Sequence, residues 1–190
     1  EHYLQEINKI IKKSTFSYIR QKQMLGLGHA VLTGEALIGD EPFAVVLADD
    51  LCDCDENGVI SQLIEIYKQY KCSVVAIEEI PMDQSKKYGI IAGNLIDNST
   101  DTYKVTEMIE KPDENNAPSN MAIIGRYILT PDIFSILKKI KPDKNGEIQI
   151  TDALNIQAKR GKVMALKFKG RRFDCGSIKG YLEATNFLAS

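Results

Sequence analysis

Two short apolar runs with a helix-like segment between them limit the possible folds of this chain more than any other feature. Residues 43–47 and 73–77 are apolar almost throughout, and apolar residues recur at spacings of three and four between residues 60 and 67. Strand, helix and strand in this order form the right-handed crossover unit of parallel sheets. Because residues 43–47 contain no polar side chain, we expect a strand that is buried on both faces of a parallel sheet.

After residue 88 the pattern becomes that of antiparallel strands. Residues 88–96 and 103–109 are strand-like and are joined by the polar turn 97–102, and residues 121–129 form another apolar strand. This pattern indicates an antiparallel insertion, between residues 88 and 125, in an α/β layered sheet.

The remaining elements complete one predicted domain, residues 1–190, of a length usual for a single domain. We expect Thr130 and Ser177 to cap the helices that follow them. Helices are predicted at residues 2–13, 26–34, 55–67, 131–140, 151–159 and 177–188, and further strands at residues 16–20 and 163–168.

The composition argues against a nucleic-acid-binding protein. The net charge is −2, and the sequence pI is about 5.8, whereas a protein that binds nucleic acid needs a basic surface to displace counterions from phosphates. One basic run, Lys167, Lys169, Arg171 and Arg172, is interpreted as the solvated face of a strand end.

The cysteines favour free thiols over a metal clasp. Cys52 and Cys54 form a CxC pair, which differs from the CxxC pairs that bind zinc, and His2 and His29 are too far away to suggest a zinc finger. The other two cysteines are Cys72 and Cys175. Free thiols are typical of a reducing compartment. No apolar run approaches the roughly 20 residues that span a bilayer, and no signal peptide is visible. We therefore expect a cytoplasmic protein without a membrane partner.

Two acidic residues follow predicted strands and are candidates for a metal site. Asp49 follows the apolar run 43–47, and Asp174 stands between a strand-like and a helical segment. Ligands of open α/β sheets bind at the carboxyl ends of strands, and carboxylate oxygens suit Mg²⁺. The alternative is that Asp49 caps the next element or is only solvated. A third possibility is a metal site on Asp53 and Asp55, which form a DxD pair, although we expect these two residues on an exposed loop.

Two weaker signals come from a charged tripeptide and a glycine pair. Glu110 and Lys111 end an alternating strand, where a carboxylate can accept sugar hydroxyl protons and an ammonium group can neutralise a sugar phosphate. Gly26 and Gly28 stand at a helix start, where glycine lets the backbone approach a ligand and helix amino-ends favour anions. Either signal alone also occurs in ordinary surface strands and turns.

Taken together and in this order, the motifs resemble those of bacterial UTP–glucose-1-phosphate uridylyltransferases from one end of the chain to the other. The segments that carry the resemblance are Arg20-Gln21, Gly26-Leu27-Gly28-His29-Ala30, Ala48-Asp49-Asp50, Tyr88-Gly89, Glu110-Lys111-Pro112, Ala117-Pro118-Ser119-Asn120-Met121-Ala122-Ile123, Gly125-Arg126-Tyr127, Gly146-Glu147-Ile148-Gln149-Ile150-Thr151-Asp152-Ala153 and Asp174-Cys175-Gly176.

The resemblance implies a fold, a reaction and a set of site residues. The fold would be the Rossmann-like layered mixed sheet of sugar nucleotidyltransferases. The reaction would transfer UMP from UTP to glucose 1-phosphate, giving UDP-glucose and pyrophosphate, with Mg²⁺ as cofactor. The resemblance assigns Gln21 and Gly26 to the uracil base, Asp49 and Asp174 to Mg²⁺, Asp50 to a ligand contact, Gly89, Glu110 and the Ile123 backbone to glucose, and Lys111 to the sugar phosphate.

This chain departs from the family's pattern in two places, which limits how far the family's roles can be assigned to it. The family begins with a strand and a loop carrying Gly-Thr-Arg, followed by a Pro-Lys pair, and neither occurs in this chain, which also opens without Met. We therefore expect that roughly the first third of the enzyme is missing, that part of the sheet is unpaired or covered by a partner, and that the fragment alone is weakly active or inactive. In addition, Ile178 occupies the position of a family lysine, with Lys179 one residue further on.

Other functions stay open at this point. The chain could be a related nucleotidyltransferase for another base or sugar, or a non-catalytic sugar-phosphate binder or assembly module. A glycosyltransferase built on Asp53 and Asp55 is the remaining alternative. The family commonly assembles into dimers or tetramers, so we expect a homo-oligomer.

Overall fold

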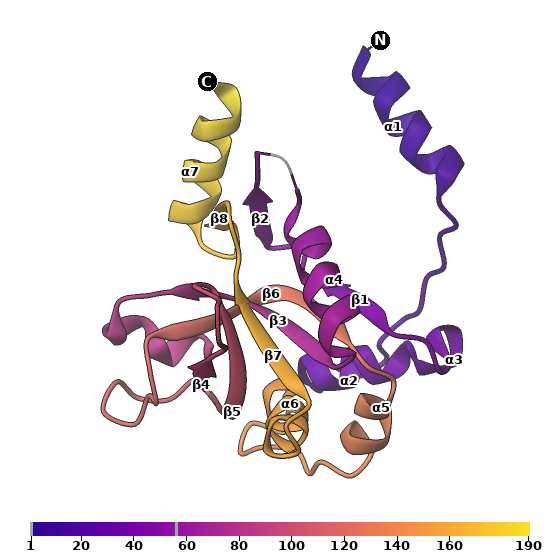
Figure 1. The fold of residues 1–190 in the computed structure, drawn as a ribbon. Helices are drawn as coiled ribbons and strands as arrows, with labels where there is room; N and C mark the ends of the chain where they lie inside the picture. The colour runs from indigo at the N-terminus through magenta and orange to yellow at the C-terminus, as the bar shows by residue number, and fades with distance from the viewer. Residues whose placement is uncertain (1, 56) are drawn as a thin grey trace.

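A six-stranded mixed sheet forms the centre of the computed structural model, which describes residues 2–55 and 57–190 (Figure 1). The strand order is β1-β6-β3-β7-β5-β4. Only β3 and β7 pair in parallel among the described strands, and the other pairings are antiparallel. The strands of this sheet are β1 (Phe43–Val46), β3 (Ser73–Glu79), β4 (Gly89–Leu95), β5 (Thr102–Glu110), β6 (Met121–Leu129) and β7 (Val163–Lys167).

Helices cover the two faces of the sheet, which gives the layered α/β architecture that the sequence predicts. Val75 and Ile77 of β3 face a core formed with α2, α5 and α6, whereas Val74 and Ala76 face a second core under α4. The helices are α2 (Gly26–Thr33), α3 (Glu35–Ile38), α4 (Val59–Tyr70), α5 (Asp132–Leu137) and α6 (Ile150–Lys159), and a 3₁₀ turn, η1 (Met82–Lys87), precedes β4. The alternation of β3 between two buried faces explains why its sequence is apolar throughout.

The prediction that residues 43–47 form a strand buried on both faces of a parallel sheet is wrong about the surroundings of the strand. The strand exists as β1, but it lies at the sheet edge, pairs antiparallel with β6, and alternates between half-buried and exposed residues. Val46 is 55% exposed. An apolar run fits a central strand and also an edge strand whose outer side is uncovered, so composition alone could not distinguish the two.

A two-stranded arm projects from the sheet and was not foreseen. Strands β2 (Asp50–Asp53) and β8 (Arg171–Asp174) pair antiparallel, and helix α7 (Ile178–Ala189) packs on β8 (Figure 1). Ser177 caps α7 as predicted, because its Oγ accepts a hydrogen bond from the Gly180 N–H at 3.1 Å. Each arm strand has only four residues, too few for a recognisable alternation.

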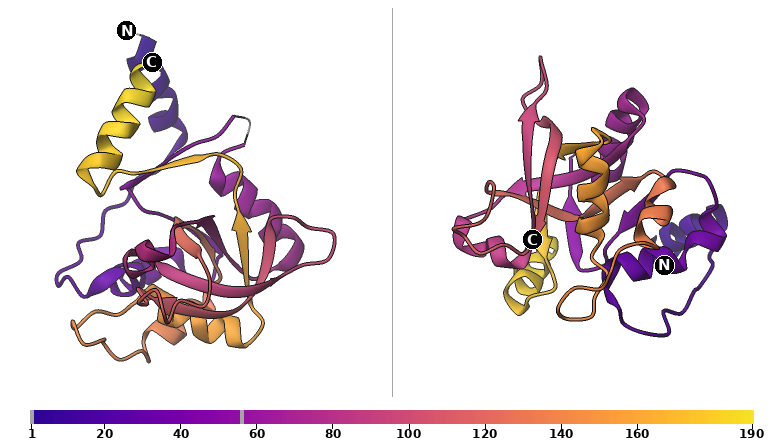
Figure 2. Two further views of the ribbon diagram at one scale, coloured as in Figure 1. Left: turned by 90° about the vertical axis from the view of Figure 1, so that its left-hand side faces the viewer. Right: turned by 90° about the horizontal axis from the view of Figure 1, so that it is seen from below.

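The other predicted elements agree with the structure, with three exceptions. The predicted helix 55–67 begins later, at Val59, and continues to Tyr70. Residues 16–20 form no strand and lie exposed, since no neighbouring strand pairs with them. The predicted helix 131–140 is shorter, Asp132–Leu137. The prediction that Thr130 caps it is wrong, because Pro131 is the N-cap residue and Thr130 Oγ1 donates to the Asp132 carboxylate instead of accepting from a backbone N–H. Helix α1 (His2–Lys13) forms as predicted and stands away from the sheet (Figure 2).

No helix in the described part of the chain is long and apolar enough to cross a bilayer.

Close packing at Gly28 predicts a stability effect. A Cβ atom there would lie 2.6 Å from the Ile148 carbonyl oxygen, which is backbone and cannot turn aside. We expect Gly28→Ala to lower the free energy of unfolding by about 1–3 kcal/mol, as overpacking does, measured by urea denaturation. Gly58→Ala is the matched control, since a Cβ atom there meets nothing within 4 Å. Equal stability of the two variants would contradict the packing described here.

Candidate active site

The base of the arm brings two distant aspartates together. Asp50 and Asp174 are register partners in the β2–β8 ladder, so the residue before β2 lies beside the residue after β8. The Cys175 N–H donates a hydrogen bond to the Asp49 carbonyl oxygen at 2.7 Å. Antiparallel pairing therefore places Asp49 and Asp174 at the same end of the arm.

Gly176 leaves the space that these two carboxylates face. A Cβ atom at Gly176 would lie 3.2 Å from Asp49 Oδ2 and 3.2 Å from Asp174 Oδ1. The two oxygens are therefore separated by no more than twice that distance. Carboxylates this close repel unless a cation or a proton lies between them.

The donor set fits Mg²⁺ better than a metal held by protein ligands alone. Mg²⁺ binds through one or two carboxylates and completes its shell with water and substrate phosphates. The described residues contain no group of three or more His, Cys, Asp or Glu side chains placed to hold a metal. Asp49 and Asp174 provide two carboxylate donors beside a space without a side chain, which matches the way Mg²⁺ is bound.

A buried arginine stands behind the aspartate pair. The Arg172 side chain is 7% exposed and its Nε bonds Asp50 Oδ1, while its terminal nitrogens reach Glu78 Oε1 and Asp174 Oδ2, the latter at 3.7 Å. Burial raises the pKa of the Glu78 carboxyl, and the Arg172 charge opposes that rise. The expectation that Arg172 is solvated is therefore wrong, whereas Lys167, Lys169 and Arg171 are exposed as predicted.

Asp50 belongs to this buried cluster at the base of the arm. Its Oδ2 accepts a hydrogen bond from the Gly125 N–H at 2.7 Å and its Oδ1 accepts one from Arg172, while its carbonyl oxygen accepts one from Arg126. The ligand contact that the resemblance assigns to Asp50 stays a prediction. Asp53 ends β2 and, like Asp55, is exposed.

A second group gathers around Gly89. A Cβ atom on Gly89 would lie 3.0 Å from Thr151 Oγ1, 3.2 Å from Ile123 Cδ1 and 3.3 Å from Glu110 Oε2. Thr151 Oγ1 also donates to Glu110 Oε2 at 2.5 Å, which fixes that carboxylate. The three residues that the resemblance assigns to glucose therefore lie side by side.

Residues 88 and 89 connect the two groups. The Tyr88 hydroxyl donates to Asp174 Oδ2 at 2.8 Å, and the Tyr88 carbonyl oxygen accepts a hydrogen bond from the Lys111 N–H at 3.0 Å. Burial raises the pKa of the Tyr88 phenol. Lys111 Nζ lies 3.5 Å from Glu110 Oε1. Lys111, the Glu110 carboxylate and the aspartate pair therefore belong to one continuous site.

A third group forms at the start of α2. Gln21 Nε2 donates to the Gly26 carbonyl oxygen at 3.2 Å and lies 2.9 Å from His29 Nδ1. Gly26 has a φ of 84°, and a Cβ atom there would lie 2.9 Å from Glu147 Cβ. The structure brings Gln21 and Gly26 together, although no hydrogen bond or ion pair of the described residues joins them to Asp49 or Asp174.

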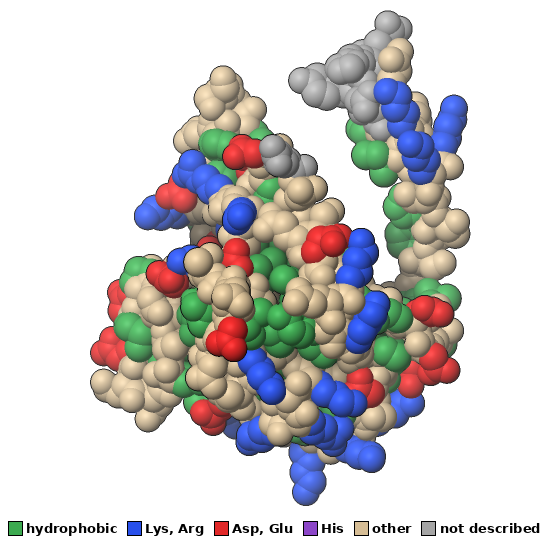
Figure 3. Space-filling model, in the orientation of Figure 1, with side chains coloured by type: hydrophobic (Ala, Val, Ile, Leu, Met, Phe, Trp, Pro, Cys, Tyr) green, Lys and Arg blue, Asp and Glu red, His purple; other side chains and the backbone are tan. Residues whose placement is uncertain are grey.

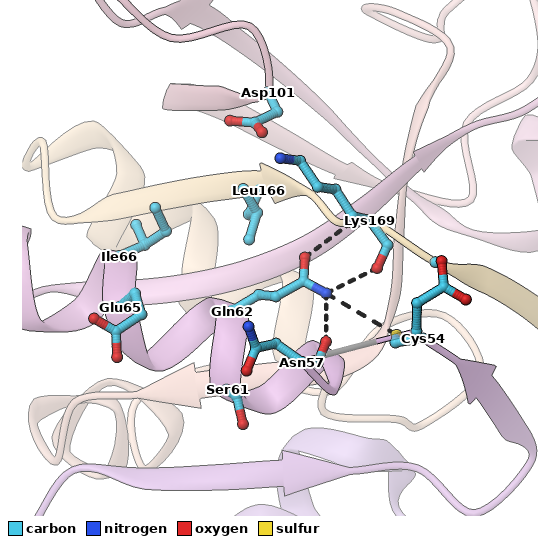
Figure 4. A pocket seen from close by; sticks show the side chains of 11 residues that line it. Cys54, Asn57, Ser61, Gln62, Glu65, Ile66, Asp101, Leu166 and Lys169 are labelled. Carbon is cyan, nitrogen blue, oxygen red and sulfur yellow. Dashed lines mark hydrogen bonds between the residues drawn. The ribbon is translucent and has the colours of Figure 1, made fainter.

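A pocket lies elsewhere, between α4 and the arm (Figure 4). Its volume is about 670 Å³, and none of its lining residues belongs to the three groups above. Gln62 crosses it, with Nε2 donating to the carbonyl oxygens of Asn57 and Lys169 and Oε1 accepting from the Lys169 N–H, each at 2.8 Å. Gln62 therefore fastens the outer part of the arm to α4.

Sequence reasoning missed three residues of the site. Tyr88 and Thr151 lie in matched motifs but received no role, and Arg172 was taken for a surface residue. No sequence signal identifies Arg172, because it and its neighbour Phe173 are both buried, whereas alternation would place the two on opposite faces with only one of them buried.

Comparison with known proteins agrees with this architecture. A family model described as nucleotidyl transferase matches residues 1–190. The chain therefore belongs to the nucleotidyl transferases.

Within that class, the relatives of the chain bear the name of one particular enzyme. UTP--glucose-1-phosphate uridylyltransferase of Pseudomonas aeruginosa is 58% identical over 188 residues, which are 98% of this chain and 67% of that protein. UTP--glucose-1-phosphate uridylyltransferase 2 of Staphylococcus saprophyticus is 41% identical over 182 residues, covering 96% of this chain and 62% of that protein. The chain is thus a member of the UTP–glucose-1-phosphate uridylyltransferases. It spans about two thirds of the length of the Pseudomonas aeruginosa protein.

Solved structures give the same result. A UDP-glucose pyrophosphorylase complexed with UDP-glucose superimposes with a TM-score of 0.94 at 56% identity, covering 99% of this chain and 71% of that chain. A putative glucose-1-phosphate thymidylyltransferase from Bacillus anthracis follows at 25% identity and a TM-score of 0.73, with 91% and 65% covered.

The buried Arg172 cluster predicts a large stability effect. Arg172→Met leaves the buried Asp50 carboxylate without its charged partner, so we expect unfolding to require about 3–5 kcal/mol less, measured by urea denaturation. The control is Lys138→Met, which breaks an exposed 2.6 Å pair with Glu35 and should cost at most about 1 kcal/mol. Similar small losses in both variants would show that the cluster does not stabilise the arm.

Proposed function

We propose that the site transfers UMP from UTP to glucose 1-phosphate and yields UDP-glucose and pyrophosphate. The convergence of Asp49 and Asp174 beside Gly176 carries this proposal, in a chain whose relatives bear the name of that reaction. In the proposed reaction, a phosphate oxygen of glucose 1-phosphate attacks the α-phosphorus of UTP in line, and pyrophosphate leaves. Positioning and charge neutralisation account for most of the catalysis of such transfers.

Asp49 and Asp174 are the residues that would hold Mg²⁺. When bound, Mg²⁺ would neutralise phosphate charge that builds up during the transfer. The support lies in the oxygen donors and in the side-chain-free space at Gly176, where a larger residue would meet both carboxylates.

Lys111 is proposed to bind the sugar phosphate. Its φ of 45° is rare for a residue with a side chain, and such strained backbone is common at ligand sites. The Lys111 side chain is 53% exposed, so its ammonium group can exchange Glu110 for an incoming phosphate. Gly89, Glu110 and the Ile123 backbone would then contact glucose, with Thr151 holding the Glu110 carboxylate.

Gln21 and Gly26 are proposed to contact the uracil base. Gln21 has both an amide donor and a carbonyl acceptor, which can pair with the edge of a pyrimidine. A side chain at residue 26 is disfavoured by the positive φ of Gly26 and by Glu147 Cβ, which would lie 2.9 Å from a Cβ atom there.

A related enzyme for another base is the second candidate. The 25% identity to the putative thymidylyltransferase is less than half the 56% identity to the UDP-glucose pyrophosphorylase, which favours the uridylyl branch. Turnover of UTP compared with dTTP separates the two candidates. A glycosyltransferase site on Asp53 and Asp55 is disfavoured, because both residues are exposed on the outer part of the arm.

Ligand binding is the most direct test of the site. Binding does not depend on turnover and therefore reports directly on the described residues. We expect Asp49→Asn and Asp174→Asn to weaken Mg²⁺-dependent UDP-glucose binding at least tenfold, because one carboxylate ligand is lost, as measured by calorimetry with and without Mg²⁺.

Asp53→Asn and Asp55→Asn are the matched controls and should bind as the wild type does. Loss of binding in these controls, with Asp49→Asn unaffected, would favour the glycosyltransferase site and contradict the proposed one.

We also propose that the protein forms homo-oligomers. Helix α1 stands apart from the body with hydrophobic side chains along one side (Figure 3), and Leu4, Ile7 and Ile11 are 51–63% exposed. An exposed apolar stripe of this kind is typical of an interaction surface.

Light scattering after size-exclusion chromatography tests this proposal. We expect Ile7→Glu to reduce the oligomer mass and Gln5→Glu, on the same helix, to leave it unchanged, since only the former places a charge in the apolar stripe. A monomeric wild-type protein at all concentrations would refute it.

A further inference from the structure

We propose that Arg172 is a positioning residue that holds Asp174 opposite Asp49, so that this pair is left free to bind the cation while Asp50 and Glu78 are not. The inference rests on the magnesium site of the proposed function. It assigns a role to a buried side chain whose charged partners are Asp50, Glu78 and Asp174.

Arg172 has three carboxylate partners in fixed directions. Its guanidinium bonds Asp50 and Glu78 directly, and its remaining amino nitrogen lies 3.7 Å from Asp174 Oδ2. A guanidinium is planar and rigid, with donors in a fork, so the position of one partner fixes the directions available to the others. Because the side chain is 7% exposed, water screens these contacts little.

Tyr88 completes the hold on Asp174. The Arg172 guanidinium carbon lies 5.1 Å from the centre of the Tyr88 ring, a cation–π distance. The Tyr88 hydroxyl then donates to Asp174 Oδ2 at 2.8 Å. Arg172 and Tyr88 thus both act on the same oxygen of Asp174.

The other oxygen of Asp174 is the one presented to the site. Asp174 Oδ1 accepts a hydrogen bond from the Gly176 N–H at 3.2 Å and faces the same side-chain-free space as Asp49 Oδ2. Arg172 and Tyr88 contact only Oδ2, so they orient the Asp174 carboxylate without occupying Oδ1, the oxygen that faces the same space as Asp49 Oδ2. This is the arrangement expected of a residue that orients a metal ligand from behind.

Charge explains why one arginine is needed at this position. Asp49, Asp50, Glu78 and Asp174 place four acidic side chains around the base of the arm, and like charges this close repel. Arg172 takes Asp50 and Glu78 as direct partners and stays farther from Asp174. The arginine thereby offsets the acids that do not face Gly176, and Asp174 keeps its charge for the cation.

Titration of Mn²⁺, followed by electron paramagnetic resonance in the presence of UDP-glucose, tests this role. The variants are Tyr88→Phe, which removes one hydroxyl, and Arg172→Lys, which keeps the charge and loses the fork. We expect each to weaken Mn²⁺ binding about 10–100-fold, the usual effect of losing a residue that orients a metal ligand. The melting temperature of Tyr88→Phe should fall by less than about 4 °C, corresponding to a small stability loss for a chain of this length.

Arg171→Lys is the matched control. Arg171 is the neighbouring residue on β8, and it stacks on the rings of Phe173 and Phe187 at 4.6 and 5.1 Å instead of facing the acids. The same chemical change there should leave Mn²⁺ affinity unaltered.

The outcomes separate this inference from the proposed function. Unchanged Mn²⁺ affinity in Tyr88→Phe, or an equal loss in Arg171→Lys, would overturn the positioning role while leaving the metal site intact. If Arg172→Lys fails to fold, Tyr88→Phe still decides the question. A wild-type protein that binds no Mn²⁺, or binds it equally well after Asp49→Asn, would overturn both proposals.

Discussion

The structure around the candidate site depends on one buried ion cluster, in which Arg172 joins Asp50 of β2 and Glu78 of β3. These contacts tie the two-stranded arm to the central sheet, because Glu78 belongs to the sheet while Asp50 and Arg172 belong to the arm. Breaking such a cluster is costly, since a carboxylate left buried without its partner cannot be solvated. The positions of Asp49 and Asp174, and thus the proposed chemistry, follow from this connection.

Much of the fold could be predicted from local pattern. Residues 121–129 are apolar apart from Arg126, because β6 is covered on both sides and has β1, β3 and β4 as neighbours. The hairpin β4–β5 and helices α4, α6 and α7 follow from periodicity and capping in the same way. The edge position of β1 could not be predicted, since it depends on which strands are present beside it, and the arm strands are too short to have a period.

The site was predicted less from chemistry than from the order of its motifs. Asp49 and Asp174 are 125 positions apart in the numbering, and only the pairing of β2 with β8 brings them together. Glu110, Gly89 and Ile123 likewise meet through β4, β5 and β6. The charge of Arg172 suggests solvent exposure, whereas its burial depends on two acids supplied by other strands, Asp50 of β2 and Glu78 of β3.

If one cation binds between Asp49 and Asp174, anomalous diffraction from crystals grown with Mn²⁺ and UDP-glucose will locate it. We expect an anomalous peak within bonding distance of one carboxylate oxygen from each aspartate, with Arg172 still bonded to Asp50 behind them. A peak at Asp53 and Asp55 instead, or bound UDP-glucose with no peak near Gly176, would contradict it.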